Sequence, residues 1–151
     1  MEPLSEGLLK IGTLAPDWTL VSNKGTNIQL TQLKGKVILL DFWGTWCVPC
    51  IKAMPEIQAI HDYFKNKQVE IIGVSVERDA KADPVGFVKK KGFTYPIVLN
   101  GASITEGYKV QIFPSLYIID KQGKIIHAEH SGGRENFKDD IIARINKALN
   151  E

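Results

Sequence analysis

The chain has 151 residues, of which 44% are hydrophobic and 24% charged, a balance typical of one soluble globular domain with a sizeable core. Its 19 basic and 17 acidic side chains leave a net charge of +2, which is too even to indicate a nucleic-acid partner. Two cysteines are too few for a disulfide-stapled scaffold or for a closed zinc site with four ligands, so we expect no metal.

The N-terminal residues 1–10 are mostly polar, and we expect them to form a flexible tail. They show neither the basic start nor the apolar centre of a secretion signal. No run of about 18 apolar residues is present, so we expect no transmembrane segment in this chain. Either the protein is cytoplasmic, or a signal or anchor was removed; both possibilities stay open.

Alternating strand and helix patterns follow. Residues 18–21 and 27–30 are strand-like and flank a turn, which predicts an N-terminal hairpin. Residues 37–43 form a nearly unbroken apolar run, typical of a central strand covered on both faces. The later stretches are predicted as a helix at 47–67, a strand at 69–76, a helix at 84–91 that ends at Gly92, a strand at 95–99, a short helix at 104–108, strands at 115–120 and 125–129, and a helix at 135–149.

This order predicts a three-layer α/β/α fold around a central mixed sheet, with an added N-terminal β-hairpin. We expect the first strands of the sheet to pair in parallel through right-handed crossovers and the last two to pair as an antiparallel hairpin. The final helix carries an apolar stripe at helical spacing, which we expect to face the core. The stripe consists of Phe137, Ile141, Ile142, Ile145 and Leu149.

The two cysteines, Cys47 and Cys50, lie three positions apart, directly after the central strand and at the start of a predicted helix. Unpaired N–H groups and the helix dipole at such a position stabilise a thiolate and lower its pKa from about 8.5 to roughly 3.5–7.5. We therefore expect Cys47 to attack disulfides and the more enclosed Cys50 to resolve the mixed disulfide. Pro49 fits the first helical turn, where a missing N–H is not needed.

Half of a zinc site, an inert disulfide and a chance pairing are alternatives for a bare C-x-x-C. His61, His127 and His130 lie far from the pair and lack zinc-ligand spacing. The strand before the motif, the helix after it, and the adjacent Trp46 favour redox exchange.

At this point the chain resembles the thioredoxin superfamily. Residues 37–50, VILLDFWGTWCVPC, are similar to its strand-to-active-site segment, and residues 42–47 are especially similar to the TlpA/ResA-like branch of extracytoplasmic reductases, which is related to the AhpC/TSA redoxins. The segments 12–17 and 69–75 extend the resemblance. It implies a single thioredoxin-like domain over residues 1–151, with the redox-active disulfide Cys47–Cys50 and no other cofactor.

The resemblance also implies neighbours for the thiols. Pro114 matches the superfamily's cis-proline, and Phe113 before it matches the residue that pairs with substrate backbone; an ordinary strand-start proline is the alternative. Trp46, Val48 and Pro49 would line the substrate groove. Trp43 would either flank the site or pack in the core.

Two positions bear on the mechanism. Asp41 interrupts the apolar strand, where thioredoxins have an aspartate linked to proton transfer, so it is a candidate base for Cys50; a solvated edge aspartate is the alternative. Ala53 stands where many ResA-like proteins carry a glutamate, and we do not assign that role to Glu56. This departure favours a general reductase over a cytochrome-maturation enzyme.

The sequence thus predicts a thiol-disulfide oxidoreductase that reduces protein disulfides, because the Val48-Pro49 pair resembles that of reducing family members. A peroxiredoxin-like peroxidase and a thioredoxin-like binding or metallochaperone domain are the alternatives. The resemblance implies a monomer on the outer side of a bacterial inner membrane or in the periplasm. Protein disulfides would be its substrates, and a membrane or thioredoxin-type donor would supply its electrons.

Overall fold

The computed structural model describes residues 4–130 and 133–151. Its centre is a five-stranded mixed sheet in the order β5-β4-β3-β6-β7. The parallel pairs β3–β4 and β4–β5 and the antiparallel pairs β3–β6 and β6–β7 match the predicted arrangement. The strands are β3 (Val37–Trp43), β4 (Val69–Ser75), β5 (Ile97–Val98), β6 (Ser115–Ile119) and β7 (Ile125–Glu129).

Strand β3 is the middle of the sheet, and all seven of its residues are buried. Side chains alternate between the two faces of a strand. Leu39 and Trp43 accordingly belong to one apolar core, whereas Leu40 and Phe42 belong to the other. The unbroken apolar run predicted this two-sided burial.

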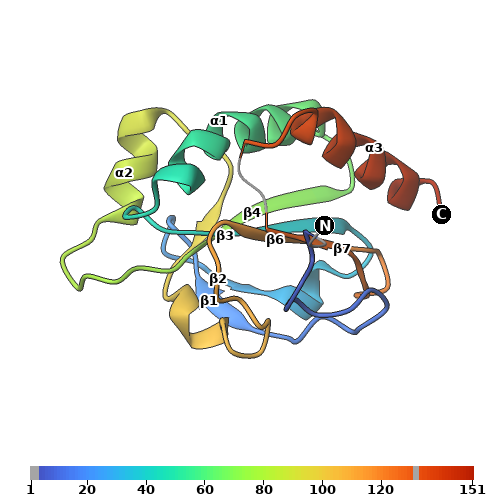
Figure 1. The fold of residues 1–151 in the computed structure, drawn as a ribbon, viewed down its shortest axis with the longest axis horizontal. Helices are drawn as coiled ribbons and strands as arrows, with labels where there is room; N and C mark the ends of the chain where they lie inside the picture. Colours follow the sequence, from blue (N-terminus) through green and yellow to red (C-terminus); the bar gives the residue numbers. More distant parts are fainter. Residues whose placement is uncertain (1–3, 131–132) are drawn as a thin grey trace.

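Three α-helices cover one face of the sheet, as Figure 1 shows: α1 (Val48–Tyr63), α2 (Pro84–Lys91) and α3 (Phe137–Leu149). The start of α2 is capped by the Asp83 carboxylate, which accepts a hydrogen bond from the Gly86 N–H at 3.0 Å, and its end by the left-handed Gly92. In α3, Phe137, Ile141 and Ile145 are buried in the core below the helices. The predicted stripe therefore does face the core.

The opposite face is covered by the hairpin of β1 (Thr19–Val21) and β2 (Asn27–Gln29), by the 3₁₀ helices η1 (Leu30–Leu33) and η2 (Gly101–Ile104), and by the N-terminal segment (Figure 1). The predicted helix at 104–108 is instead the short η2 followed by a turn. Gly101 lets η2 begin early and lie directly on β4, because a Cβ there would collide with Val74. The left-handed Lys109 then ends the turn.

Two helix boundaries also differ from the prediction. Helix α1 ends at Tyr63 and not at residue 67, and the left-handed Asn66 turns the chain into β4. Helix α3 begins at Phe137 and not at residue 135, because Asn136 before it is left-handed. Both boundaries, the end of α1 and the start of α3, depend on single left-handed residues, which hydrophobic periodicity does not predict.

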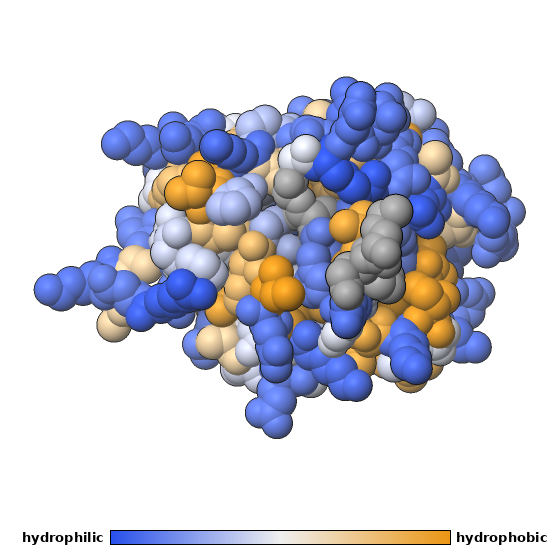
Figure 2. All heavy atoms as spheres, viewed as in Figure 1, coloured by the Kyte–Doolittle hydropathy of each residue, from blue (hydrophilic) through white to orange (hydrophobic). Residues whose placement is uncertain are grey.

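Residues 4–9 of the expected tail lie against the sheet, and residues 1–3 lie outside the described residues. The His130 N–H donates to the Leu4 carbonyl at 2.8 Å, and the Leu9 N–H donates to the Tyr117 hydroxyl at 3.0 Å. Leu8 between them is buried in the core of that face. On the face seen in Figure 2, hydrophilic side chains predominate and apolar groups are exposed in places. Within the described part of the chain, no helix is both long and apolar enough to cross a membrane.

Candidate functional site

The two cysteines lie at the start of α1 and form a disulfide, with their Cα atoms 5.3 Å apart. Cys47 is the N-cap of the helix, and its sulfur accepts a hydrogen bond from the Cys50 N–H at 3.3 Å. The first turn contains no acidic residue that would oppose a thiolate. Cys47 is 4% exposed and Cys50 is fully buried, so an approaching sulfur reaches Cys47 first.

Apolar side chains next to Cys47 in the sequence and just before Pro114 form an apolar rim. Val48 is 59% exposed and Ile112 is 56% exposed, which is unusual for side chains of this size. Pro49 is exposed beside Val48, and the rings of Trp46 and Phe113 meet edge-on with their centroids 5.3 Å apart. The rim presents a surface that fits apolar polypeptide.

The Phe113–Pro114 peptide bond is cis, as the resemblance implied. Pro114 is buried immediately before β6, whose first residue, Ser115, pairs with Phe42. Because β6 runs antiparallel to β3, its start lies at the carboxyl end of β3. This pairing brings residues 113–114 to the edge of the sheet where the cysteines lie.

Asp41 is 2% exposed on the central strand, so the alternative of a solvated edge aspartate is wrong. It pairs with Gly73 on one side and Leu116 on the other. The alternation of β3 puts Asp41 on the same face as Leu39 and Trp43, which is the face covered by α1 and its cysteines. Burial raises the pKa of the Asp41 carboxyl to about 7.

Sequence reasoning missed the polar atoms that lie next to Asp41. A Cβ on its strand partner Gly73 would lie 2.9 Å from the Trp43 Nε1 and 3.3 Å from the Tyr95 ring. The Trp43 Nε1 and the Tyr95 hydroxyl are both buried without a hydrogen-bond partner among the described residues. Burial, and to a smaller extent the charge of Asp41, raises the pKa of Tyr95. Trp43 is fully buried, so it packs in the core.

The loop after β4 is fastened to the segment before Cys47, and no sequence motif indicated this. The Val76 N–H donates to the Trp43 carbonyl at 2.7 Å, and the Trp46 Nε1 donates to the Val76 carbonyl at 2.8 Å. Gly44 permits the second bond, since a Cβ there would collide with both of its atoms. The loop therefore holds the Trp46 ring in place.

Glu77 makes a second connection between the same segments. Its carboxylate accepts hydrogen bonds from the Thr45 hydroxyl at 2.5 Å, from the Thr45 N–H at 3.1 Å and from the Ser75 hydroxyl at 3.0 Å. The guanidinium of the next residue, Arg78, lies over the Trp46 ring, with Cζ 3.4 Å from the ring centroid. A cation thus lies over the ring of the residue that precedes Cys47.

Ala53 is buried in α1 and supplies no carboxylate at the position where many ResA-like proteins carry one. The Glu56 carboxylate accepts a hydrogen bond from the Lys138 N–H at 3.1 Å, in the first turn of α3. Glu56 therefore caps the other long helix and does not take the place of the missing glutamate.

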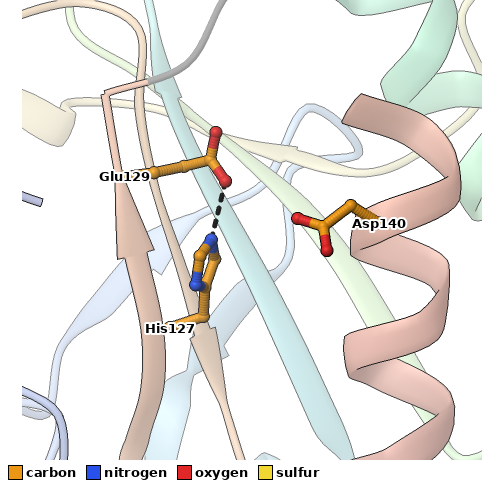
Figure 3. Close-up of side chains that lie close together, drawn as sticks. All are labelled: His127, Glu129 and Asp140. Carbon is orange, nitrogen blue, oxygen red and sulfur yellow. Dashed lines mark hydrogen bonds and ion pairs between the residues drawn. The ribbon is translucent and has the colours of Figure 1, made fainter. Parts of the chain in front are cut away.

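Figure 3 shows a second polar cluster, formed by His127 and Glu129 on β7 and Asp140 on α3. Their ligand atoms lie within 4.8 Å of one another, as they would around a metal ion. However, Arg134 donates to Glu129 at 2.7 and 2.8 Å and to Asp140 at 2.6 Å. Because the guanidinium already neutralises both carboxylates, a metal ion would have to displace it. The cluster is explained as an ion-pair network that joins β7 to α3.

The fold and the dithiol at the start of α1 define a thiol-disulfide oxidoreductase of the thioredoxin superfamily. The model of the AhpC/TSA family matches residues 11–128, and the chain belongs to this family. Thiol-disulfide oxidoreductase ResA of Bacillus cereus (strain ZK / E33L) is 36% identical over 119 residues, which are 78% of this chain and 68% of that protein. The chain is thus a TlpA/ResA-like member of the superfamily.

Solved structures agree with this assignment. A proposed thiol:disulfide interchange protein DsbE from Chlorobium tepidum has a TM-score of 0.82 and 29% identity, covering 93% of this chain and 99% of that one. The thioredoxin domain of a thiol-disulfide oxidoreductase from Bacteroides vulgatus has a TM-score of 0.79 and 30% identity, covering 93% of this chain and 99% of that one.

The buried ion pair predicts how stability depends on pH. Burial alone would raise the pKa of Glu129, but hydrogen bonds from Arg134 and His127 lower it from 4.5 to about 2. A lowered folded-state pKa stabilises the protein fully above pH 4.5, and this contribution is lost as the pH falls toward 2. At about 1.4 kcal/mol per pKa unit, it amounts to about 3 kcal/mol.

We therefore expect Glu129→Gln to be less stable than the wild type above pH 4.5 and the difference to shrink as the pH approaches 2. Urea unfolding at several pH values measures this, with the exposed Glu135→Gln as the matched control. A difference that stays constant from pH 7 to pH 2 would contradict the assignment.

Proposed function

We propose that this protein reduces disulfide bonds in polypeptides, with Cys47 as the attacking thiolate and Cys50 as the resolving thiol. The observation that carries the proposal is the asymmetry of the pair: Cys47 is the N-cap of α1 and is 4% exposed, whereas Cys50 is fully buried. The apolar rim of Trp46, Val48 and Phe113 supports an unfolded or extended polypeptide as the substrate.

The reaction follows from this asymmetry in two exchanges. The Cys47 thiolate attacks one sulfur of the substrate disulfide, forms a mixed disulfide and releases the other substrate sulfur as a thiolate. The Cys50 thiolate then attacks the Cys47 sulfur, closes the Cys47–Cys50 disulfide and releases the second substrate thiolate. The substrate gains two electrons, and the dithiol loses them.

Asp41 is proposed as the acceptor of the Cys50 proton. It faces the layer that carries the cysteines, and burial raises its pKa to about 7. A base whose pKa lies near the working pH combines a useful deprotonated fraction with a useful driving force for proton transfer. The carboxylate would take the proton as Cys50 attacks, and return it to solvent after the substrate leaves.

A peroxidase is less well supported. Peroxiredoxins use a threonine or serine hydroxyl near the reactive thiol, whereas the Thr45 hydroxyl donates to Glu77 at 2.5 Å. A metallochaperone remains the non-enzyme alternative, because thiolates bind Cu(I). The assay below separates both from a disulfide reductase.

The cellular setting is proposed from the relatives. From the similarity to ResA, we propose that the protein is located outside the cytoplasm of a bacterium. On the same basis we propose that it is a monomer and that a membrane or thioredoxin-type donor supplies its electrons. Ala53 in place of a glutamate supports a general reductase over one dedicated to cytochrome maturation.

Insulin reduction tests the function directly. We expect the reduced protein to accelerate insulin precipitation over dithiothreitol alone, because the dithiol reacts first and dithiothreitol then regenerates it. Cys47→Ser should lose this acceleration, and Cys50→Ser should accumulate a mixed disulfide with insulin that mass spectrometry detects. Precipitation no faster than with dithiothreitol, or an undiminished rate in Cys47→Ser, would refute the proposal.

Asp41→Asn tests the proton acceptor. We expect release of the second substrate thiol to rise with pH around 7 in the wild type and to lose this rise in Asp41→Asn, with a loss of about 100-fold at pH 8 for a general base. Quenched single-turnover reactions measure the step, with the exposed Asp139→Asn as control. Equal pH profiles in the wild type and Asp41→Asn would remove Asp41 from the mechanism.

The same variant, Asp41→Asn, should be more stable than the wild type although its chemistry is slower. The folded-state pKa of Asp41 is raised from 3.8 to about 7, so the fold loses stability as the pH rises from about 3.8 to about 7, and the loss is complete above that pH. At about 1.4 kcal/mol per pKa unit, removing the charge stabilises the protein at pH 8 by up to about 4 kcal/mol. If Asp41→Asn releases the substrate thiol more slowly and is also more stable, the slower rate is due to loss of the base and not to damage to the fold.

A further inference from the structure

The loop after β4 places a fixed positive charge at the mouth of the thiol site. The Arg78 Cζ lies 3.4 Å from the centroid of the Trp46 ring, so the planar guanidinium stacks on the indole. Trp46 immediately precedes Cys47 and forms part of the apolar rim. Stacking leaves the N–H groups at the edge of the guanidinium directed away from the ring, where they can donate to a partner.

The position of Arg78 is set by the residues before it. Val76 exchanges hydrogen bonds with Trp43 and Trp46 at 2.7 and 2.8 Å, and Glu77 accepts from Thr45. These contacts join the loop to the segment that leads into Cys47. The charge is therefore ordered before any substrate arrives, which lowers the entropy lost when a partner binds.

Among the described residues, Arg78 has no acidic partner. None of the ion pairs formed by residues 4–130 and 133–151 includes it. The neighbouring Glu77 carboxylate accepts hydrogen bonds from Thr45 and Ser75, and the Asp79 carboxylate accepts from the Lys81 N–H at 2.9 Å. The exposed guanidinium is thus available to an acidic group from outside.

There is also room for such a group. A surface groove of about 410 Å³ is lined by Arg78 together with Leu99, Asn100 and Ala102. The carboxylates of Glu77 and Asp79 also line it, but both accept hydrogen bonds from within the protein. On its other side Arg78 borders the rim through Trp46. A polypeptide that presents a sulfur to Cys47 can therefore extend a neighbouring side chain toward the guanidinium.

We propose that Arg78 determines substrate specificity by pairing with an acidic side chain close to the target cysteine of the substrate polypeptide. The inference rests on the proposed function, since it assigns the kind of polypeptide on which the dithiol acts. The apolar rim would hold the residues next to the disulfide, and Arg78 would select an acidic neighbour by a charge-assisted hydrogen bond.

Peptides with a single activated cysteine test this selection. Three neutral-ended synthetic peptides carry a 2-thiopyridyl disulfide on cysteine, flanked by Glu, Gln or Lys. The Cys47 thiolate attacks the peptide sulfur and releases 2-thiopyridone, whose absorbance gives the rate of the first exchange. The ratio of the Glu to the Gln rate within one variant cancels any change in Cys47 reactivity.

We expect the reduced wild type to prefer the Glu peptide over the Gln peptide by about threefold at low ionic strength, as for an exposed ion pair, and less at high salt. Arg78→Gln should bring the ratio to about one, and Arg78→Glu should prefer the Lys peptide. Lys81→Gln, a matched loss of one exposed positive charge in the same loop, should keep the wild-type ratio.

Equal Glu-to-Gln ratios in the wild type and Arg78→Gln would overturn the inference while leaving the proposed function intact. An equal loss of the ratio in Lys81→Gln would also overturn it, because general surface charge would then explain the preference. Failure to release 2-thiopyridone from any of the peptides would instead refute the proposed function, and the inference with it.

Discussion

The pairing of β3 with its two neighbouring strands positions every part of the site at the carboxyl end of β3. β3 lies between β4 and β6, so three chain segments meet where it ends. The parallel partner β4 continues there into the loop of Glu77 and Arg78, and the antiparallel partner β6 begins there after Pro114. The chain leaving β3 reaches Cys47 within four residues. Strand pairing thus assembles the thiols, the cis-proline and the charged loop.

The site combines an apolar exterior with polar groups that are costly to bury. Asp41, the Trp43 Nε1 and the Tyr95 hydroxyl are all buried. Asp41 pairs with Gly73, next to which the Trp43 Nε1 and the Tyr95 ring also lie. A buried carboxyl and unpartnered donors lower stability, so their concentration beneath the cysteines is better explained by chemistry than by packing. The Glu129–Arg134 network differs, because each charge there has an opposite charge as its partner.

Local signals explain what could be predicted from the sequence. The apolar run of β3, the end of α2 at Gly92 and the spacing of Cys47 and Cys50 are patterns that lie within a few residues, and the structure has them where predicted. The contact of Arg78 with Trp46 and the position of Tyr95 over Gly73 join residues that lie 20 or more positions apart. No periodicity or motif encodes such contacts. The prediction of a short helix at 104–108 was wrong because Gly101 packs on β4, and such a contact between distant segments cannot be read from local sequence.

The most direct test of the account is the pH dependence of alkylation of the reduced protein by iodoacetamide, mapped to each cysteine by mass spectrometry. We expect Cys47 to reach its half-maximal rate of reaction below about pH 7.5, as for a thiolate at a helix start, and Cys50 to stay unmodified until the protein is unfolded. Half-maximal reaction of Cys47 near pH 8.5, or earlier labelling of Cys50, would contradict it.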